Sequence, residues 1–180
     1  MQAVGSFVLA VLYLLCAGSG IALSGWLLAR RREQGPAVRG EAAALALTAC
    51  WALTTLGLGA TAHATGVLMS LTYFAWLWTL YRLFAHDDRD KSVTPIRAVV
   101  FALGFVELMQ LVVLAVQIGE PGAAASIAVF SATLRLLFCI GALVLVHNLY
   151  AGASQEARQA LGWPAAALAV LWLYDLNLST

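Results

Sequence analysis

Residues 98–146 read AVVFALGFVELMQLVVLAVQIGEPGAAASIAVFSATLRLLFCIGALVLV. The stretch contains two long apolar runs on either side of a short Gly-Glu-Pro-Gly segment at residues 119–122. Each run supplies the roughly 20 mostly apolar residues that an α-helix needs to cross a hydrocarbon core of about 30 Å. The stretch therefore predicts two consecutive transmembrane helices joined by a short turn.

The whole chain is rich in apolar residues, as this stretch is. Of its 180 residues, 62% are hydrophobic and 11% are charged, and the mean hydropathy is +0.87. Soluble domains are about 45–50% apolar and about 25% charged. Ten basic residues balance nine acidic ones, so the chain lacks the basic surface that nucleic-acid binding requires. These values predict an integral membrane protein with membrane lipid, and no nucleic acid, as a partner.

Six windows along the chain meet the length requirement for a span. They cover residues 4–28, 42–62, 64–84, 98–118, 123–146 and 160–178. Proline disrupts helix interiors and is tolerated in loops and first turns. Accordingly, Pro36, Pro95 and Pro121 fall between windows, and Pro164 falls near the start of the last one. The predicted fold class is all-α: a polytopic bundle of about six transmembrane helices forming a single domain over residues 1–180.

The connections between windows differ sharply in charge. Apart from Arg135, every Lys and Arg lies in or beside the first, third or fifth connection: Arg30, Arg31, Arg32 and Arg39; Arg82, Arg89, Lys91 and Arg97; and Arg158. The connections around His63 and at residues 119–122 have no Lys or Arg. The positive-inside rule then predicts an N-terminus outside and three cytoplasmic basic loops. Because the link around His63 is so short, its two helices are expected to be antiparallel neighbours.

Glu107 and Arg135 are charged residues near the middle of the fourth and fifth windows. A charge at that depth costs about 2.5–3.5 kcal/mol on insertion scales. Because the two windows are consecutive, their helices are expected to pack side by side, and an ion pair would remove most of this cost. Two interpretations stay open: the pair locks two helices together, or it belongs to a site for a ligand, a lipid headgroup or a proton.

The residues around the two charges fall on defined helix faces at 100° per residue. In the fourth window, one arc holds Gly104, Glu107, Gln110 and Gln117. In the fifth, another holds Ala124, Ala128, Ser131, Arg135, Cys139 and Ala142. Because small residues let helices approach closely, the second face is predicted to be a packing seam.

No cofactor or metal site is predicted. Cys16, Cys50 and Cys139 lie far apart without metal-like spacing, and no histidine stands at mid-membrane where haem ligation would need a facing pair. The lone lysine, Lys91, lies in a loop, whereas a retinal Schiff base needs a lysine within a span. No catalytic motif was found, so no enzymatic activity is expected within these residues.

Aromatic and acidic residues mark the end of the last window. Trp172 and Tyr174 lie toward its outer end, where Trp and Tyr concentrate at the membrane–water interface. Asp175 follows them directly. It is interpreted either as an interfacial carboxylate that reaches water or as a residue for sensing or helix pairing.

Residues 143–180 read LVLVHNLYAGASQEARQALGWPAAALAVLWLYDLNLST. They resemble the N-terminal membrane region of the sensor histidine kinases of the bacterial PEP-CTERM/exosortase system. In that family a Leu/Val run leads to Glu-Asn-Leu-Tyr-Arg-Asn, an acidic residue and Arg follow, and the next span closes with Tyr-Asp-Leu-x-Leu. The matching residues are Asn148, Leu149, Tyr150, Glu156, Arg158, Tyr174, Asp175, Leu176 and Leu178. The chain departs from the pattern with His147 for Glu, Ala151-Gly152 for Arg-Asn, and Gly162 where Lys is common.

The resemblance implies a function for the chain. It would be the membrane-embedded signal-input module of a two-component sensor histidine kinase that regulates exopolysaccharide and exosortase (PEP-CTERM) genes. The resemblance further implies multi-pass insertion in a bacterial inner (cytoplasmic) membrane and a homodimer formed through the full-length kinase. A response regulator would interact with kinase domains that these 180 residues do not contain. The 180 residues are therefore expected to be a fragment of a longer protein. The alternative is a small transporter or channel subunit with a polar path through the fourth and fifth spans.

Overall fold

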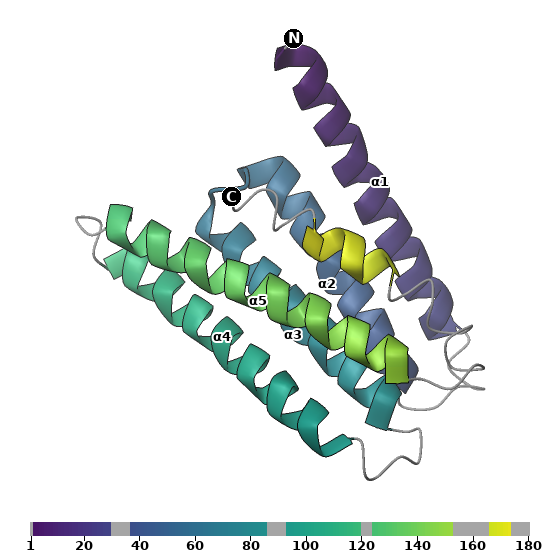
Figure 1. The fold of residues 1–180 in the computed structure, drawn as a ribbon. Helices are drawn as coiled ribbons and strands as arrows, with labels where there is room; N and C mark the ends of the chain where they lie inside the picture. The colour runs from purple at the N-terminus through teal and green to yellow at the C-terminus, as the bar shows by residue number, and fades with distance from the viewer. Residues whose placement is uncertain (1, 30–36, 86–92, 120–123, 153–165, 174–180) are drawn as a thin grey trace. The chain divides into compact units, whose positions relative to one another are not determined.

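The computed structural model describes residues 2–29, 37–85, 93–119, 124–152 and 166–173, and all regular structure in them is helical. The five named helices are α1 (Gln2–Ala29), α2 (Ala37–Leu58), α3 (His63–Ala85), α4 (Val93–Gly119) and α5 (Ala124–Gly152), shown in Figure 1. A shorter helical stretch covers residues 166–173. The all-α prediction is confirmed for the part of the chain that the structure describes.

Four of the helices are long and apolar enough to cross a membrane. The stretches that qualify are Gly5–Ala29, Val38–Leu58, Ile96–Gly119 and Ser126–Ala151, which belong to α1, α2, α4 and α5. The chain is therefore a membrane protein by the length and composition of these helices.

The two other predicted spans do not meet these criteria of length and apolar composition. Helix α3 has 23 residues, enough in length, but it is rich in threonine, tyrosine and tryptophan, which are less apolar than leucine or valine. Of the window at 160–178, only the helix at 166–173 lies within the described residues. That helix alone is too short to span a bilayer. A membrane-spanning role for these two segments stays a prediction.

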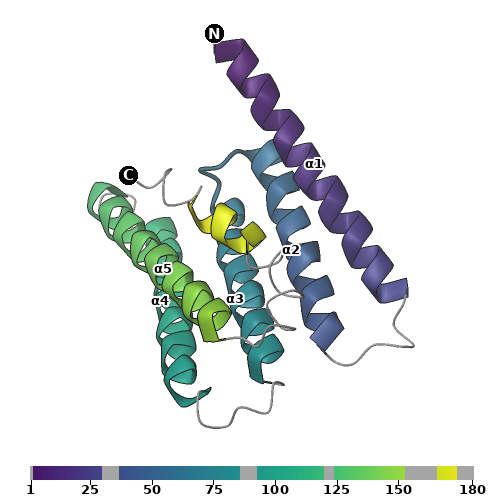
Figure 2. The same cartoon turned by 45° about the vertical axis from the view of Figure 1, so that its right-hand side comes forward.

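The chain divides into two compact units, Met1–Leu83 and Phe84–Thr180. The first contains α1, α2 and almost all of α3, and the second contains α4, α5 and the helix at 166–173. Helices α1 and α2 lie side by side in the first unit, as α4 and α5 do in the second (Figure 2). The single bundle expected from the sequence stays a prediction.

Small residues bring α1 and α2 into close contact. A Cβ at Gly20 would lie 3.0 Å from the Leu45 carbonyl oxygen and 3.1 Å from Ala49 Cβ. One turn further along α1, the buried Ser24 hydroxyl donates a 3.0 Å hydrogen bond to the Ala42 carbonyl. The N-terminal turns of α1 extend beyond α2 in both ribbon views (Figures 1 and 2).

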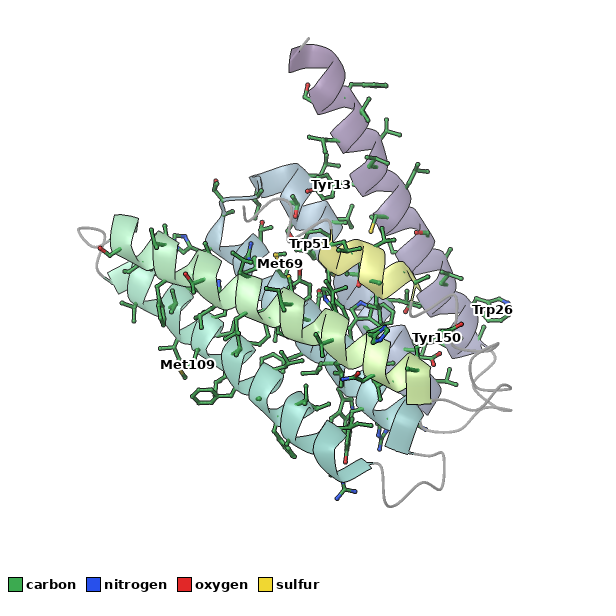
Figure 3. All side chains as sticks on the ribbon, in the orientation of Figure 1. Tyr13, Trp26, Trp51, Met69, Met109 and Tyr150 are labelled. Carbon is green, nitrogen blue, oxygen red and sulfur yellow. The ribbon has the colours of Figure 1, made fainter. Side chains whose placement is uncertain are left out.

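Aromatic rings complete this contact on the other side of Gly20. Tyr13 of α1 and Trp51 of α2 point toward each other (Figure 3). Their ring centroids are 5.8 Å apart and their planes lie at 75°, the edge-to-face arrangement that aromatic pairs prefer. The α1–α2 contact therefore extends at least from Ala42 to Trp51 of α2.

Gly59 ends α2 and begins the tight connection to α3. Its φ of 89° lies in the left-handed region, and its N–H donates to the Thr55 carbonyl at 3.0 Å, as in a helix C-cap. The buried Thr65 hydroxyl donates a 2.9 Å bond to the Gly59 carbonyl and fastens the start of α3. Trp76 Nε1 of α3 donates to Thr48 Oγ1 of α2 at 3.0 Å. The predicted antiparallel pairing of these two helices is confirmed.

Two interhelical contacts define how α4 and α5 pack. Leu103 meets Gly141, where an added Cβ would lie 2.6 Å from Leu103 Cδ2. Further along α4, Gln110 meets Ser131, nearer the start of α5. Because the residue numbers run in opposite directions, the helices are antiparallel. The predicted side-by-side packing of the fourth and fifth spans is confirmed.

Candidate intramembrane polar site

One face of α4 is buried and carries the polar residues. Leu103, Glu107 and Gln110 follow each other at helical spacing, with exposed fractions of 5%, 2% and 2%. Phe101 and Phe105, on the opposite side, are exposed to 75% and 60%, as expected for a surface that faces lipid. The prediction that Glu107 and Gln110 share one face is confirmed.

The side chain of Gln110 connects this face to α5. Its Nε2 donates a 2.5 Å hydrogen bond to Ser131 Oγ, on the face predicted to be a packing seam. Its Oε1 is buried and has no hydrogen-bond partner within the described residues. In a membrane, such interhelical hydrogen bonds contribute about 0.6 kcal/mol on average and up to about 1.7 kcal/mol. The site thus combines a hydrogen bond between two helices with a buried acceptor atom, Gln110 Oε1.

Glu107 and Arg135 lie at the same level of the α4–α5 pair. Glu107 is one turn before Gln110 on α4, and Arg135 is one turn after Ser131 on the antiparallel α5. The ion pair expected between their side chains stays a prediction. Arg135 is half-buried, whereas Glu107 is buried.

The structure describes part of the family motif. Leu149 is buried, whereas Asn148 and Tyr150 are exposed near the C-terminal end of α5, where Figure 3 labels Tyr150. The motif residues Glu156, Arg158, Tyr174, Asp175, Leu176 and Leu178 lie outside the described residues. The motif therefore begins on the same continuous helix that carries Ser131 and Arg135.

Trp172, which is predicted to lie toward the outer end of the last span, packs against α5. It is fully buried, and its ring meets Phe138 of α5 edge-on, with centroids 6.1 Å apart and planes at 82°. Its Nε1 is also buried, with no hydrogen-bond partner within the described part of the chain. Hydropathy alone did not indicate this contact, because an interfacial and a buried tryptophan look alike in sequence.

The chemistry available at the polar site is hydrogen bonding within apolar surroundings. It offers an amide, a hydroxyl and a carboxyl group on two packed helices. Within the described residues, no group of three or more His, Cys, Asp or Glu side chains could hold a metal ion.

Comparisons of the chain with protein-family models, with curated proteins and with solved structures found no match.

Proposed function

We propose that the chain is the membrane-embedded signal-input module of a two-component sensor histidine kinase. The observation that carries the proposal is the pair of sequence motifs Asn148-Leu149-Tyr150 and Tyr174-Asp175-Leu176 at their family spacing. The genes controlled would be those for exopolysaccharide and for exosortase-sorted (PEP-CTERM) proteins. The full-length protein would dimerise and pass its signal to a response regulator.

The proposed topology has six spans in a bacterial inner membrane, with the N-terminus outside. Four helices of suitable length and composition support the membrane setting. The confinement of Lys and Arg to alternate connections supports the orientation. In this topology α5 runs from the outer to the cytoplasmic side and ends in the Asn148-Leu149-Tyr150 motif.

The proposed mechanism uses the α4–α5 pair as a two-state element. A signal that favours one packing of the pair over another shifts the population between the two states. The Gln110–Ser131 hydrogen bond would be present in one packing of the pair and broken in the other. Because α5 is a single helix of 29 residues, a movement at Ser131 would reach Tyr150 without an intervening loop.

The coding DNA beyond codon 180 provides the first test. We expect an open frame that continues through further spans into a phosphoacceptor histidine and an ATP-binding domain. Autophosphorylation of that full-length kinase, reconstituted in proteoliposomes, is then expected to change with Gln110→Leu, while Thr133→Val on the exposed side of α5 leaves it unchanged. A reading frame that encodes no kinase core would overturn the proposal.

A second function is favoured by the buried polar face of α4. Glu107 and Gln110 are buried there, and Gln117, two turns beyond Gln110, is half-buried. Such a row would suit a small transporter or channel subunit with a polar path along α4 and α5. Solute flux into proteoliposomes containing the wild-type protein, abolished by Glu107→Ala, would favour this alternative. The absence of solute flux with the wild-type protein would count against it.

A further inference from the structure

The side chains of Gln110 and Ser131 have hydrogen-bonding capacity beyond the bond that joins them. Gln110 Oε1 is buried and accepts no hydrogen bond within the described residues. The Ser131 hydroxyl accepts one hydrogen bond, from Gln110 Nε2, but donates none to the described part of the chain. An unused acceptor and an unused donor therefore belong to the same two side chains.

Ser131 differs in this respect from threonines within the helices. The Thr133 hydroxyl donates to the Val129 carbonyl of α5, and the Thr48 hydroxyl donates to the Ala44 carbonyl of α2. A bond to the carbonyl four residues earlier is a common partner for a hydroxyl group inside a helix. Because Ser131 makes no such bond, its proton is available at the contact between α4 and α5.

The unused acceptor calls for a partner. Roughly 90% or more of buried polar groups in proteins have a hydrogen-bond partner, because a buried group without one loses its hydration for no return. The partner of Gln110 Oε1 must donate a hydrogen bond to the amide, and the partner of the Ser131 hydroxyl must accept one. A single water molecule does both, and a water bridge is nearly as favourable in enthalpy as a direct hydrogen bond.

The surroundings of the two side chains suit a ligand of this size. Ser131 is half-buried, and Ala128, one turn before it on the same face of α5, contributes a single methyl group and is exposed. Gln110 lies nine residues, about 14 Å, from the C-terminal end of α4. Gln117 of α4 and Ser126 of α5 are polar residues nearer that end. Small and polar side chains therefore lie between Gln110 and the end of the helix pair, where water can enter.

We infer that Gln110 and Ser131 together hold one water molecule between α4 and α5. The water accepts a hydrogen bond from the Ser131 hydroxyl and donates one to Gln110 Oε1, while Gln110 Nε2 donates to Ser131 Oγ. The three groups form a closed ring in which each donates one hydrogen bond and accepts one. If the amide is turned over, every bond in the ring reverses and the water is still needed. The inference does not depend on the proposed kinase role.

Solid-state NMR of the full chain, ¹⁵N-labelled and reconstituted in deuterated lipid bilayers, tests the inference. Magnetisation transferred from water protons identifies the nitrogen atoms that have a water next to them. We expect transfer to Gln110 Nε2, whose signal is assigned by its loss in Gln110→Leu. We expect none to the backbone nitrogen of Leu108, which lies at a similar depth on the exposed side of α4. Transfer to Gln110 Nε2 that is no faster than transfer to Leu108 would overturn the inference.

Ser131→Ala should abolish the transfer to Gln110, because a buried water needs at least two polar partners and this variant removes one of them. Thr133→Val is the matched control: it removes a hydroxyl that is bonded within α5 itself, and it should leave the transfer unchanged. Full transfer in Ser131→Ala, or equal loss in both variants, would overturn the inference. Circular dichroism checks the folding of each variant. If Ser131→Ala does not fold, the comparison of Gln110 with Leu108 in the wild-type protein decides the outcome.

Discussion

Gly20 of α1 faces Ala49 of α2 so closely that a Cβ on the glycine would lie 3.1 Å from Ala49 Cβ. The same Cβ would lie 3.0 Å from the carbonyl oxygen of Leu45, a backbone atom that cannot rotate away. In membranes, helix pairs are held by such close backbone approach, since lipid gives apolar side chains no hydrophobic reason to associate. The α1–α2 pair therefore depends on the absence of a side chain at position 20.

Gly20→Ala is expected to destabilise the protein, because overpacking of a close contact costs about 1–3 kcal/mol. Gly25→Ala on the same helix is the matched control: a Cβ there meets nothing within 4 Å, and alanine favours helix by about 0.5–1 kcal/mol. The free energies of unfolding of both variants, measured by SDS titration in mixed micelles, check this. Equal effects of the two substitutions would contradict the packing described for α1 and α2.

The Gln110–Ser131 hydrogen bond predicts an energetic coupling between α4 and α5. Ser131→Ala leaves the buried Gln110 amide without its partner, so it should cost more than the bond itself contributes. In a double-mutant cycle with Gln110→Leu, we expect a coupling of about 0.6 kcal/mol and no more than about 1.7 kcal/mol.

Thr133→Val is the control for that cycle. Thr133 is exposed on α5, and its hydroxyl donates to Val129 of the same helix, so its loss should not couple to Gln110. Unfolding of all variants by SDS provides the measurement. A coupling of Gln110 to Thr133 as large as its coupling to Ser131 would show that the cycle reports general loosening of α5 and not the hydrogen bond.

Glu107 and Arg135 give a second double-mutant cycle. They lie at one level of the α4–α5 pair, and the ion pair expected from the sequence predicts a coupling between them. Because breaking a buried ion pair from either side costs about 3–5 kcal/mol, we expect Glu107→Gln and Arg135→Gln together to cost less unfolding free energy than the sum of the single changes. SDS unfolding of the three variants provides the measurement. Additivity within about 0.3–0.5 kcal/mol would contradict the ion pair.

A comparison of the predicted spans with the helices of the structure shows which features the sequence could predict. Helices α1, α2, α4 and α5 were predictable because the length and apolarity of a span are local properties. The predicted ends were less accurate. The window at 123–146 stops where His147 and Asn148 interrupt the apolar run, yet both continue α5 to Gly152. The window at 42–62 likewise misses the polar start of α2, which includes Arg39.

The candidate site was predictable in its face but not in its contacts. Helical spacing alone placed Glu107 and Gln110 together, and it placed Ser131 on the facing seam. Whether two facing side chains form a hydrogen bond depends on their length and rotamer, so the Gln110–Ser131 bond is a tertiary property. The burial of Trp172 against Phe138 likewise depends on how a separate segment folds back on α5.

The connection between α2 and α3 gives a last prediction. Gly59 has a φ of 89°, and the left-handed conformation costs an L-residue with a Cβ about 1–2 kcal/mol. Gly59→Ala should therefore destabilise the protein by about that amount, and Gly59→Asn by less, because asparagine tolerates this conformation. Gly57→Ala, in open space within α2, is the control and should be neutral or stabilising. SDS unfolding again provides the free energies. If Gly59→Ala were as stable as Gly57→Ala, the C-cap would not require glycine.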